Sequence, residues 1–119
     1  MAITTWSDFT GGLEADDLAF ITHYRDFCRS LDEATEEVHR SAVQYKQARI
    51  FTSAYVKSHY LEVQVDLLHE AKHPALRTSF ASTKKVTTHR ITLRHLEQWD
   101  DDLEDLIREA AETVGPRTR

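Results

Sequence analysis

Two histidines and a glutamate stand at the spacing of a zinc-protease motif. Residues 69–73 read His-Glu-Ala-Lys-His, an H-E-x-x-H string. On a helix this spacing puts both imidazoles on one face, where they bind zinc while the glutamate acts as the general base. Here the preceding residues alternate like a strand, and Pro74 disfavours helical geometry at His73. We therefore expect a loop and predict no metal ligands, although His89 or Glu97 could be nominated as a third ligand. A zinc-dependent hydrolase stays as the least favoured alternative.

Two other reactive residues have simpler explanations. Ser82 and Lys85 form an S-x-x-K, but the S-D-N and K-T-G motifs that accompany it in serine acyl-transferases do not occur. Cys28, the only cysteine, falls on the apolar stripe of a predicted helix, which favours a buried, inert thiol. The three glycines form no phosphate-binding loop, and we predict no cofactor. Since no nucleophile–base or metal arrangement emerges, the sequence leans away from an enzyme.

A looser group of polar residues lies at or near the inward positions of the predicted sheet. His89 alternates with Thr87, Ile91 and Leu93, so its imidazole should face the apolar side. Taken alone, such a histidine is best explained as a hydrogen-bonded core residue. Together, these side chains could hold a small anionic or aromatic molecule between the sheet and a covering helix. The predicted ligand-binding residues are Arg40, Ser41, Tyr45, Arg49 and His89.

Hydrophobic periodicity predicts the elements that position these residues. Residues 14–31 repeat apolar side chains at helical spacing, and residues 98–114 form a second amphipathic helix with aspartates in its first turn. A β-region opens at Val38, Val43 and Tyr45 and continues to Leu93.

Three stretches of this β-region are predicted strands. Residues 61–67 alternate apolar and polar side chains, and they should pair with residues 49–56 across a polar break at 57–59. In the strand 49–56 we expect Phe51 on the face opposite to Thr52 and Ala54. Residues 69–82 read as a connection with a helical turn near 76–80, and a further strand covers residues 85–93. These elements predict an α+β fold, an antiparallel sheet of four to five strands covered by N-terminal and C-terminal helices.

Size and composition set the broad class. The 119 residues fit one domain spanning residues 1–119, with 40% hydrophobic and 29% charged residues. We expect a cytoplasmic protein without a membrane partner, because the N-terminus lacks a secretory signal pattern, no apolar run is long enough to span a bilayer, and one cysteine allows no internal disulfide. The net charge of -5 argues against a nucleic-acid partner. A strip from Lys72 to Arg94 is nevertheless basic and free of acids, as a lysine-protected edge strand would be.

The order of several short segments resembles a known family. The segments are V-H-R-S-A-V-Q-Y, A-R-I-F-T, T-T-H-R-I-T-L and D-D-D-L-E-D-L-I-R-E-A. They are similar to bacterial proteins of the domain of unknown function 5655 family, over most of the chain. The resemblance implies an α+β fold with a curved sheet and gives weight to Arg40, Ser41, Tyr45 and His89 as a shared site. At residue 40 this chain has arginine where the family pattern has lysine, and His39 replaces a hydroxyl residue. The resemblance implies no reaction.

Two main functional hypotheses follow. In the first, the domain binds a small anionic or aromatic ligand without catalysis: Arg40 pairs with the anion, while Ser41, Tyr45 and His89 form hydrogen bonds with it. In the second, the domain is a protein-interaction or homodimerisation module that uses an exposed strand edge or leftover aromatic residues. A thermal upshift that depends on Arg40 favours the first hypothesis, and a dimer in light scattering favours the second.

Overall fold

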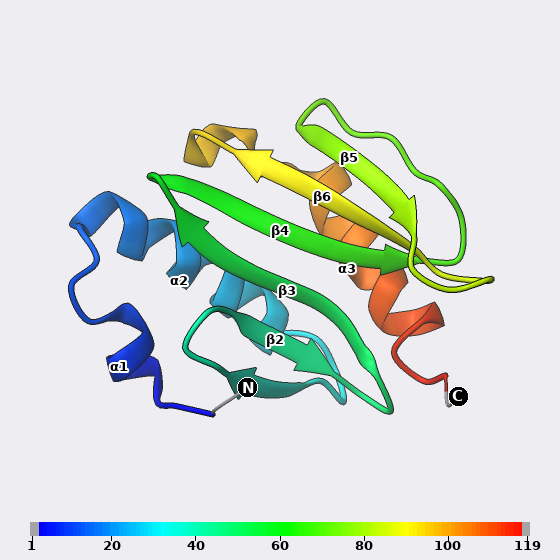
Figure 1. The fold of residues 1–119 in the computed structure, drawn as a ribbon, viewed down its shortest axis with the longest axis horizontal. Coiled ribbons are helices and arrows are strands. Elements are labelled where there is room, and N and C mark those ends of the chain that lie inside the picture. The colour runs from blue at the N-terminus through cyan, green and yellow to red at the C-terminus, as the bar shows by residue number, and fades with distance from the viewer. Residues whose placement is uncertain (1–2, 118–119) are drawn as a thin grey trace.

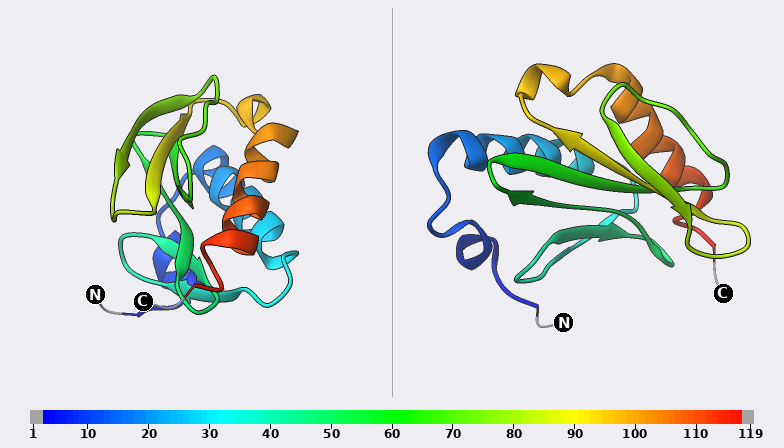
Figure 2. Two further views of the ribbon diagram at one scale, coloured as in Figure 1. Left: turned by 90° about the vertical axis from the view of Figure 1, so that its right-hand side faces the viewer. Right: turned by 45° about the horizontal axis from the view of Figure 1, so that its top comes forward.

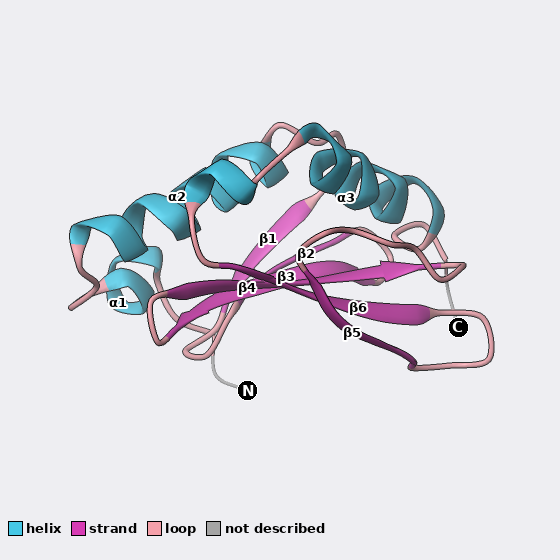
Figure 3. Ribbon diagram, turned by 90° about the horizontal axis from the view of Figure 1, so that it is seen from above, coloured by secondary structure: helices cyan, strands magenta, loops and turns pink. Residues whose placement is uncertain are grey.

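The computed structural model describes residues 3–117 as a single antiparallel sheet with helices on one face (Figure 1). Viewed from above, α2 and α3 both lie over the same side of the sheet (Figure 3). The predicted α+β fold is therefore confirmed, with six strands in place of four to five. The elements in chain order are α1 (Trp6–Thr10), α2 (Ala15–Arg29), β1 (Thr35–Val38), β2 (Val43–Lys46), β3 (Ile50–Lys57), β4 (Tyr60–Leu67), β5 (Leu76–Ala81), β6 (Thr87–Leu93), η1 (Leu96–Gln98) and α3 (Asp101–Thr113).

The strand order in the sheet is β1-β2-β3-β4-β6-β5, and every neighbouring pair is antiparallel. The alternation in β4 sets its two faces. Leu61, Val63, Val65 and Leu67 are fully buried under the helices. The residues between them point to the other side, which carries no helix in Figure 3. We call this side the open face.

Acidic residues begin the C-terminal helix as the sequence predicts. Asp100 is the N-cap of α3, and its Oδ1 accepts a hydrogen bond of 2.9 Å from the backbone N–H of Leu103. Asp101 and Asp102 follow in the first turn, where the helix dipole favours negative charge. The helix buries Leu103 and Ile107 against the sheet.

A two-residue hairpin joins β3 to β4 and confirms their predicted pairing. Ser58 and His59 form the loop, and both have positive φ angles, of 52° and 67°. Two consecutive positive φ angles are typical of a type I′ turn, whose twist matches that of the flanking strands. The His59 ring lies 2.9 Å from the buried carboxylate of Asp17, which ties this turn to α2.

An irregularity between β2 and β3 overturns one predicted orientation. Tyr45 pairs with Thr52 and Lys46 pairs with Ile50, so Phe51 is an extra residue on β3. Such a bulge breaks the strict alternation of a strand. As a result Phe51 is fully buried in the core, beside Thr52. The prediction that Phe51 lies on the face opposite to Thr52 was wrong.

A further strand occupies part of the predicted connection. Residues 76–80, expected as a helical turn, belong to β5 instead, which pairs with β6 at the margin of the sheet. Figure 2 shows the β1–β2 hairpin and the β5–β6 hairpin at opposite margins of the sheet. Because β6 lies between β4 and β5, the loop of residues 68–75 leads from β4 past β6 to β5.

Buried side chains fill the space between the sheet and the helices. Tyr24 and Cys28 of α2, Tyr45 and Phe51 of the sheet and Ile107 of α3 are all at most 1% exposed. This burial confirms the prediction for Cys28, and it raises the pKa of its thiol far above the usual range. Within residues 3–117 no helix is long and apolar enough to cross a membrane.

Candidate functional site

The structure places the five residues predicted from sequence at four separate positions. Arg40 and Ser41 are exposed in the turn between β1 and β2. Arg49 follows the other end of β2, where its backbone N–H donates to the carbonyl of Gly115 at 3.0 Å. Tyr45 and His89 are both buried on the helix-covered face and stand in one cross-strand row, with β3 and β4 between them. Three strand spacings separate these two by about 14 Å.

Tyr45 takes part in a polar network that fastens α2 to the sheet. Its hydroxyl donates to Glu36 Oε2 at 2.6 Å, and Arg25 donates to both oxygens of the same carboxylate at 2.8 and 3.0 Å. Burial opposes ionisation of Glu36, but the hydrogen bonds from Arg25 and Tyr45 outweigh it and hold the pKa below its usual value. Burial raises the pKa of Tyr45, and the bond to Glu36 adds to the rise. This network explains Tyr45 as a structural residue.

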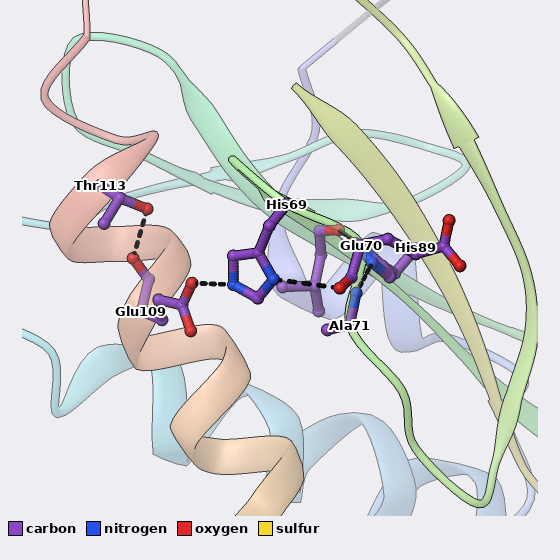
Figure 4. A network of polar contacts seen from close by, with 7 residues as sticks. His69, Glu70, Ala71, His89, Glu109 and Thr113 are labelled. Carbon is purple, nitrogen blue, oxygen red and sulfur yellow. Dashed lines mark hydrogen bonds and ion pairs between the residues drawn. The ribbon is translucent and has the colours of Figure 1, made fainter. Parts of the chain in front are cut away.

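His89 anchors the loop that contains the H-E-x-x-H string (Figure 4). The backbone N–H of Ala71 donates to His89 Nε2 at 2.8 Å, so this nitrogen must be unprotonated. The ring proton is then on Nδ1, which lies 3.2 Å from the carbonyl oxygen of Val65. The prediction of an imidazole on the apolar side is confirmed, because His89 is 1% exposed. Its two bonds span β4, β6 and the loop.

The two histidines of the string bind different carboxylates on α3. His69 Nε2 lies 2.5 Å from Glu109, and His73 Nε2 lies 2.9 Å from Asp100. These acids are nine residues apart, about 13 Å along a helix. In Figure 4 the Glu70 carboxylate is turned away from the His69 ring. The string is a loop without helical structure, and no cluster of three metal-ligating side chains occurs in the described chain.

These contacts also shift the pKa values of His69 and Asp100. The backbone carbonyl of Glu70 and the carboxylate of Glu109 both face the His69 ring and raise its pKa. At Asp100, burial works against ionisation, but hydrogen bonds from His73 and from the N–H of Leu103 lower the pKa. Residues 69–73 are thus fastened to α3 at two places and to β6 at a third.

On the other side of this loop, the open face carries a cleft of about 520 Å³. Its wall is the end of the loop and the start of β5, and its floor is formed by outward-facing residues of β4 and β6. We call it the Glu62 cleft. It is lined by Tyr60, Glu62, Pro74, Ala75, Leu76, Arg77, Thr92, Arg94 and Gln98.

The Glu62 cleft combines a buried carboxylate with two arginines. Glu62 is only 7% exposed, and its Oε2 accepts a hydrogen bond of 2.8 Å from the Thr92 hydroxyl. Its Oε1 lies 3.7 Å from Arg77, a long ion pair with a largely exposed guanidinium. The Arg94 guanidinium lies over the ring of Tyr60, 5.3 Å from its centre. Two positive charges and one aromatic ring therefore surround the single acid that lines the cleft.

The sequence predicts the orientation of some of these residues but not that they lie next to one another. The alternation of 61–67 predicts that Glu62 points away from the core, and Thr92 is the corresponding residue between buried Ile91 and Leu93. The missing signal was the pairing of β4 with β6, which sets Glu62 directly opposite Thr92.

A comparison with protein families identifies the family to which this chain belongs. Residues 7–114 match the model of a domain of unknown function, DUF5655. The chain belongs to the DUF5655 family. The match covers every element of the DUF5655 domain from α2 to α3, including the loop with its histidines and the Glu62 cleft. No curated protein and no solved structure shows significant similarity to the chain.

Proposed function

We propose that this domain binds a small anionic molecule in the Glu62 cleft, without a catalytic step. The observation that carries the proposal is the placement of Arg77 and Arg94 around a cleft whose only acid is already hydrogen-bonded. Guanidinium groups recognise carboxylates and phosphates through paired hydrogen bonds. The cleft volume of about 520 Å³ lies in the range of small-molecule sites.

Each side chain has a defined task in this proposal. Within residues 3–117 the guanidinium of Arg77 has a 3.7 Å contact to Glu62 and the side chain of Arg77 is 68% exposed, so an incoming anion can draw it away at small cost. Arg94 is positioned by the Tyr60 ring, and the same ring offers an apolar wall for the ligand. Glu62 is fixed by Thr92 and can accept a hydrogen bond from a hydroxyl or amine of the ligand. An anion that also carries a donor group fits this set best.

Thermal unfolding tests the proposal with inorganic phosphate, citrate and adenosine monophosphate as probes. A ligand at ten times its dissociation constant stabilises the folded state by about 1.4 kcal/mol, an upshift of roughly 5 °C in a domain of this size. We expect Arg94→Ala and Arg77→Ala to remove the upshift. Arg108→Ala is the matched control, because Arg108 is exposed on α3 and bonded to Asp105.

Two kinds of upshift would contradict the cleft proposal. One is an upshift that survives in both cleft variants. The other is an upshift that depends on Arg40 instead, since Arg40 lines a separate surface pocket with Thr4, Asp8 and Phe9. That outcome would place the ligand at the turn predicted from the sequence. If none of the three probes raises the melting temperature, anion binding by this cleft is rejected for these classes of ligand.

A further inference from the structure

Strand β5 forms an edge of the sheet that is open to a partner. Within residues 3–117 it has one neighbouring strand, β6, so part of its backbone N–H and C=O groups point outward. Thr78, Phe80 and Ala81 are exposed, and Phe80 retains 43% of its surface. Such an edge can pair with an extended segment of another chain.

Features that commonly block an edge are missing from most of β5. Its irregularity lies between Leu76 and Thr78, at the start of the strand, and the following residues 78–81 carry no charge and no proline. The opposite edge differs. There the N–H of Thr4 donates to the Val38 carbonyl at 2.8 Å, and Ile3 pairs with His39, so the N-terminal segment covers the end of β1.

The charge around β5 selects the partner. Residues 71–96 contain six lysines and arginines and no acid, in a chain whose net charge is -5. Lys84 and Lys85 lie in the turn that joins β5 to β6, and both are exposed. On the open face Arg90 pairs with Thr78, and its guanidinium lies 5.4 Å from the centre of the Phe80 ring.

We propose that β5 pairs with an acidic, extended segment of another protein, which adds a seventh strand to the sheet. Backbone hydrogen bonds would supply the pairing, and alternate side chains of the added strand would lie beside Thr78 and Phe80 on the open face. An apolar residue next to Phe80 and acidic residues near Lys84, Lys85 and Arg90 fit this surface.

The same charges disfavour a second copy of this chain as the partner. An antiparallel pairing of two β5 strands would bring the Lys84–Lys85 turn of one copy near Arg77 at the start of the other. Like charges at that distance oppose association. Leu76 and Arg77 of β5 also line the Glu62 cleft, whereas Arg94 lines that cleft but lies outside β5, so a substitution of Arg94 tests the cleft without changing the edge strand.

The experiment is an NMR titration of the ¹⁵N-labelled chain with a soluble peptide of alternating glutamate and valine, up to about 1 mM. We expect shifts of the backbone amides of residues 76–81 and slower exchange of those that point outward. Lys84→Glu should weaken binding about fivefold, and Lys57→Glu, an equal charge change at the far end of β3, should leave it nearly unchanged. Arg94→Ala should also leave it unchanged, which separates this test from that of the cleft.

Each remaining outcome overturns the proposal. These outcomes are absence of any shift at that concentration, shifts confined to other strands, an equal effect of Lys57→Glu and Lys84→Glu, or equal binding of a lysine–valine peptide. Binding of a single-stranded oligothymidine, sensitive to Lys84→Glu, in place of the acidic peptide would identify the strip as a nucleic-acid surface. Dimerisation in sedimentation runs without peptide, with the β5 amides protected, would identify a second copy as the partner.

Discussion

Replacing His89 by leucine tests whether one buried imidazole holds the 68–75 loop in place. The structure gives His89 two bonds, one from the N–H of Ala71 to Nε2 and one from Nδ1 to the carbonyl of Val65. Leucine has a similar size, so it should fit without a large cavity, but it can make neither bond. The loop would then keep its two contacts to α3, at Glu109 and Asp100, and the bond of 3.1 Å from the Thr92 N–H to the carbonyl of Ala75.

The expected loss of stability can be estimated from these bonds. Two hydrogen bonds contribute about 1 kcal/mol each, and the Ala71 N–H left without a partner costs about 1 kcal/mol more. The additional apolar surface of leucine returns about 1 kcal/mol. We therefore expect His89→Leu to lower the free energy of unfolding by about 2 kcal/mol and the melting temperature by roughly 8 °C. Glutamine can still accept from Ala71, so His89→Gln should lose about half as much.

Urea unfolding measures the loss, and hydrogen exchange of single amides locates it. The Ala71 amide should exchange much faster in His89→Leu than in the parent chain. The Arg49 amide is the internal control, because it lies outside this loop and donates to the carbonyl of Gly115 at 3.0 Å. Unchanged exchange at Ala71, or equal stability of the leucine and glutamine variants, would refute the role of His89 as the anchor of this loop.

Three further predictions concern the electrostatics and the backbone. Glu36→Gln should lower the free energy of unfolding by about 1–2 kcal/mol at neutral pH. Because folding lowers the pKa of Glu36, the contribution of its carboxylate to stability is present above the usual pKa of 4.5. In urea titrations this contribution should be lost as the pH falls through the pKa of the folded state. His69 behaves oppositely: its folded pKa is raised, so the stability difference between the parent chain and His69→Ala should be full below 6.5 and disappear as the pH rises through the folded value. Ser58→Asn should raise the free energy of unfolding by about 0.5–1 kcal/mol and the melting temperature by a few degrees, because asparagine tolerates the positive φ of 52° better than serine does. An unchanged or lower melting temperature would contradict the assignment of this turn.

Periodic patterns predicted the elements that are buried on one side. The alternation of residues 61–67 identified β4 and its inward face, and helical spacing identified α2 and α3 to within a few residues. These patterns succeed because burial on one face imposes a period of two on a strand and 3.6 on a helix. The polar break at 57–59 was likewise enough to predict the hairpin.

Elements without one buried face were beyond these patterns. In β5, Leu76 and Ser79 are half-buried and the other four residues are exposed, so no alternation marks the strand, and only its pairing with β6 makes it one. Phe51 was misplaced because a bulge shifts the alternation by one residue, and the sequence carries no separate sign of it. Both errors concern pairing between segments, which local pattern does not encode.

The candidate cleft has the same origin in strand order. Because β6 lies between β4 and β5, the chain leaving β4 must pass two strand positions, about 10 Å, before it can begin the next strand. A two-residue turn cannot cover that distance, so residues 68–75 form a loop, and their histidines fix it to α3 and β6.

The H-E-x-x-H string therefore has a structural role in this loop. An imidazole in a crossing loop can hydrogen-bond a carboxylate with one ring nitrogen and a backbone group with the other. His73 illustrates the point, since one ring nitrogen binds Asp100 and the other accepts from the N–H of Ala75. Pro74 and Ala75 follow at once and form part of the wall of the Glu62 cleft. The position of that wall, and with it the spacing between Arg77 and Glu62, therefore depends on the loop histidines, so a variant that frees the loop should weaken anion binding without touching either arginine.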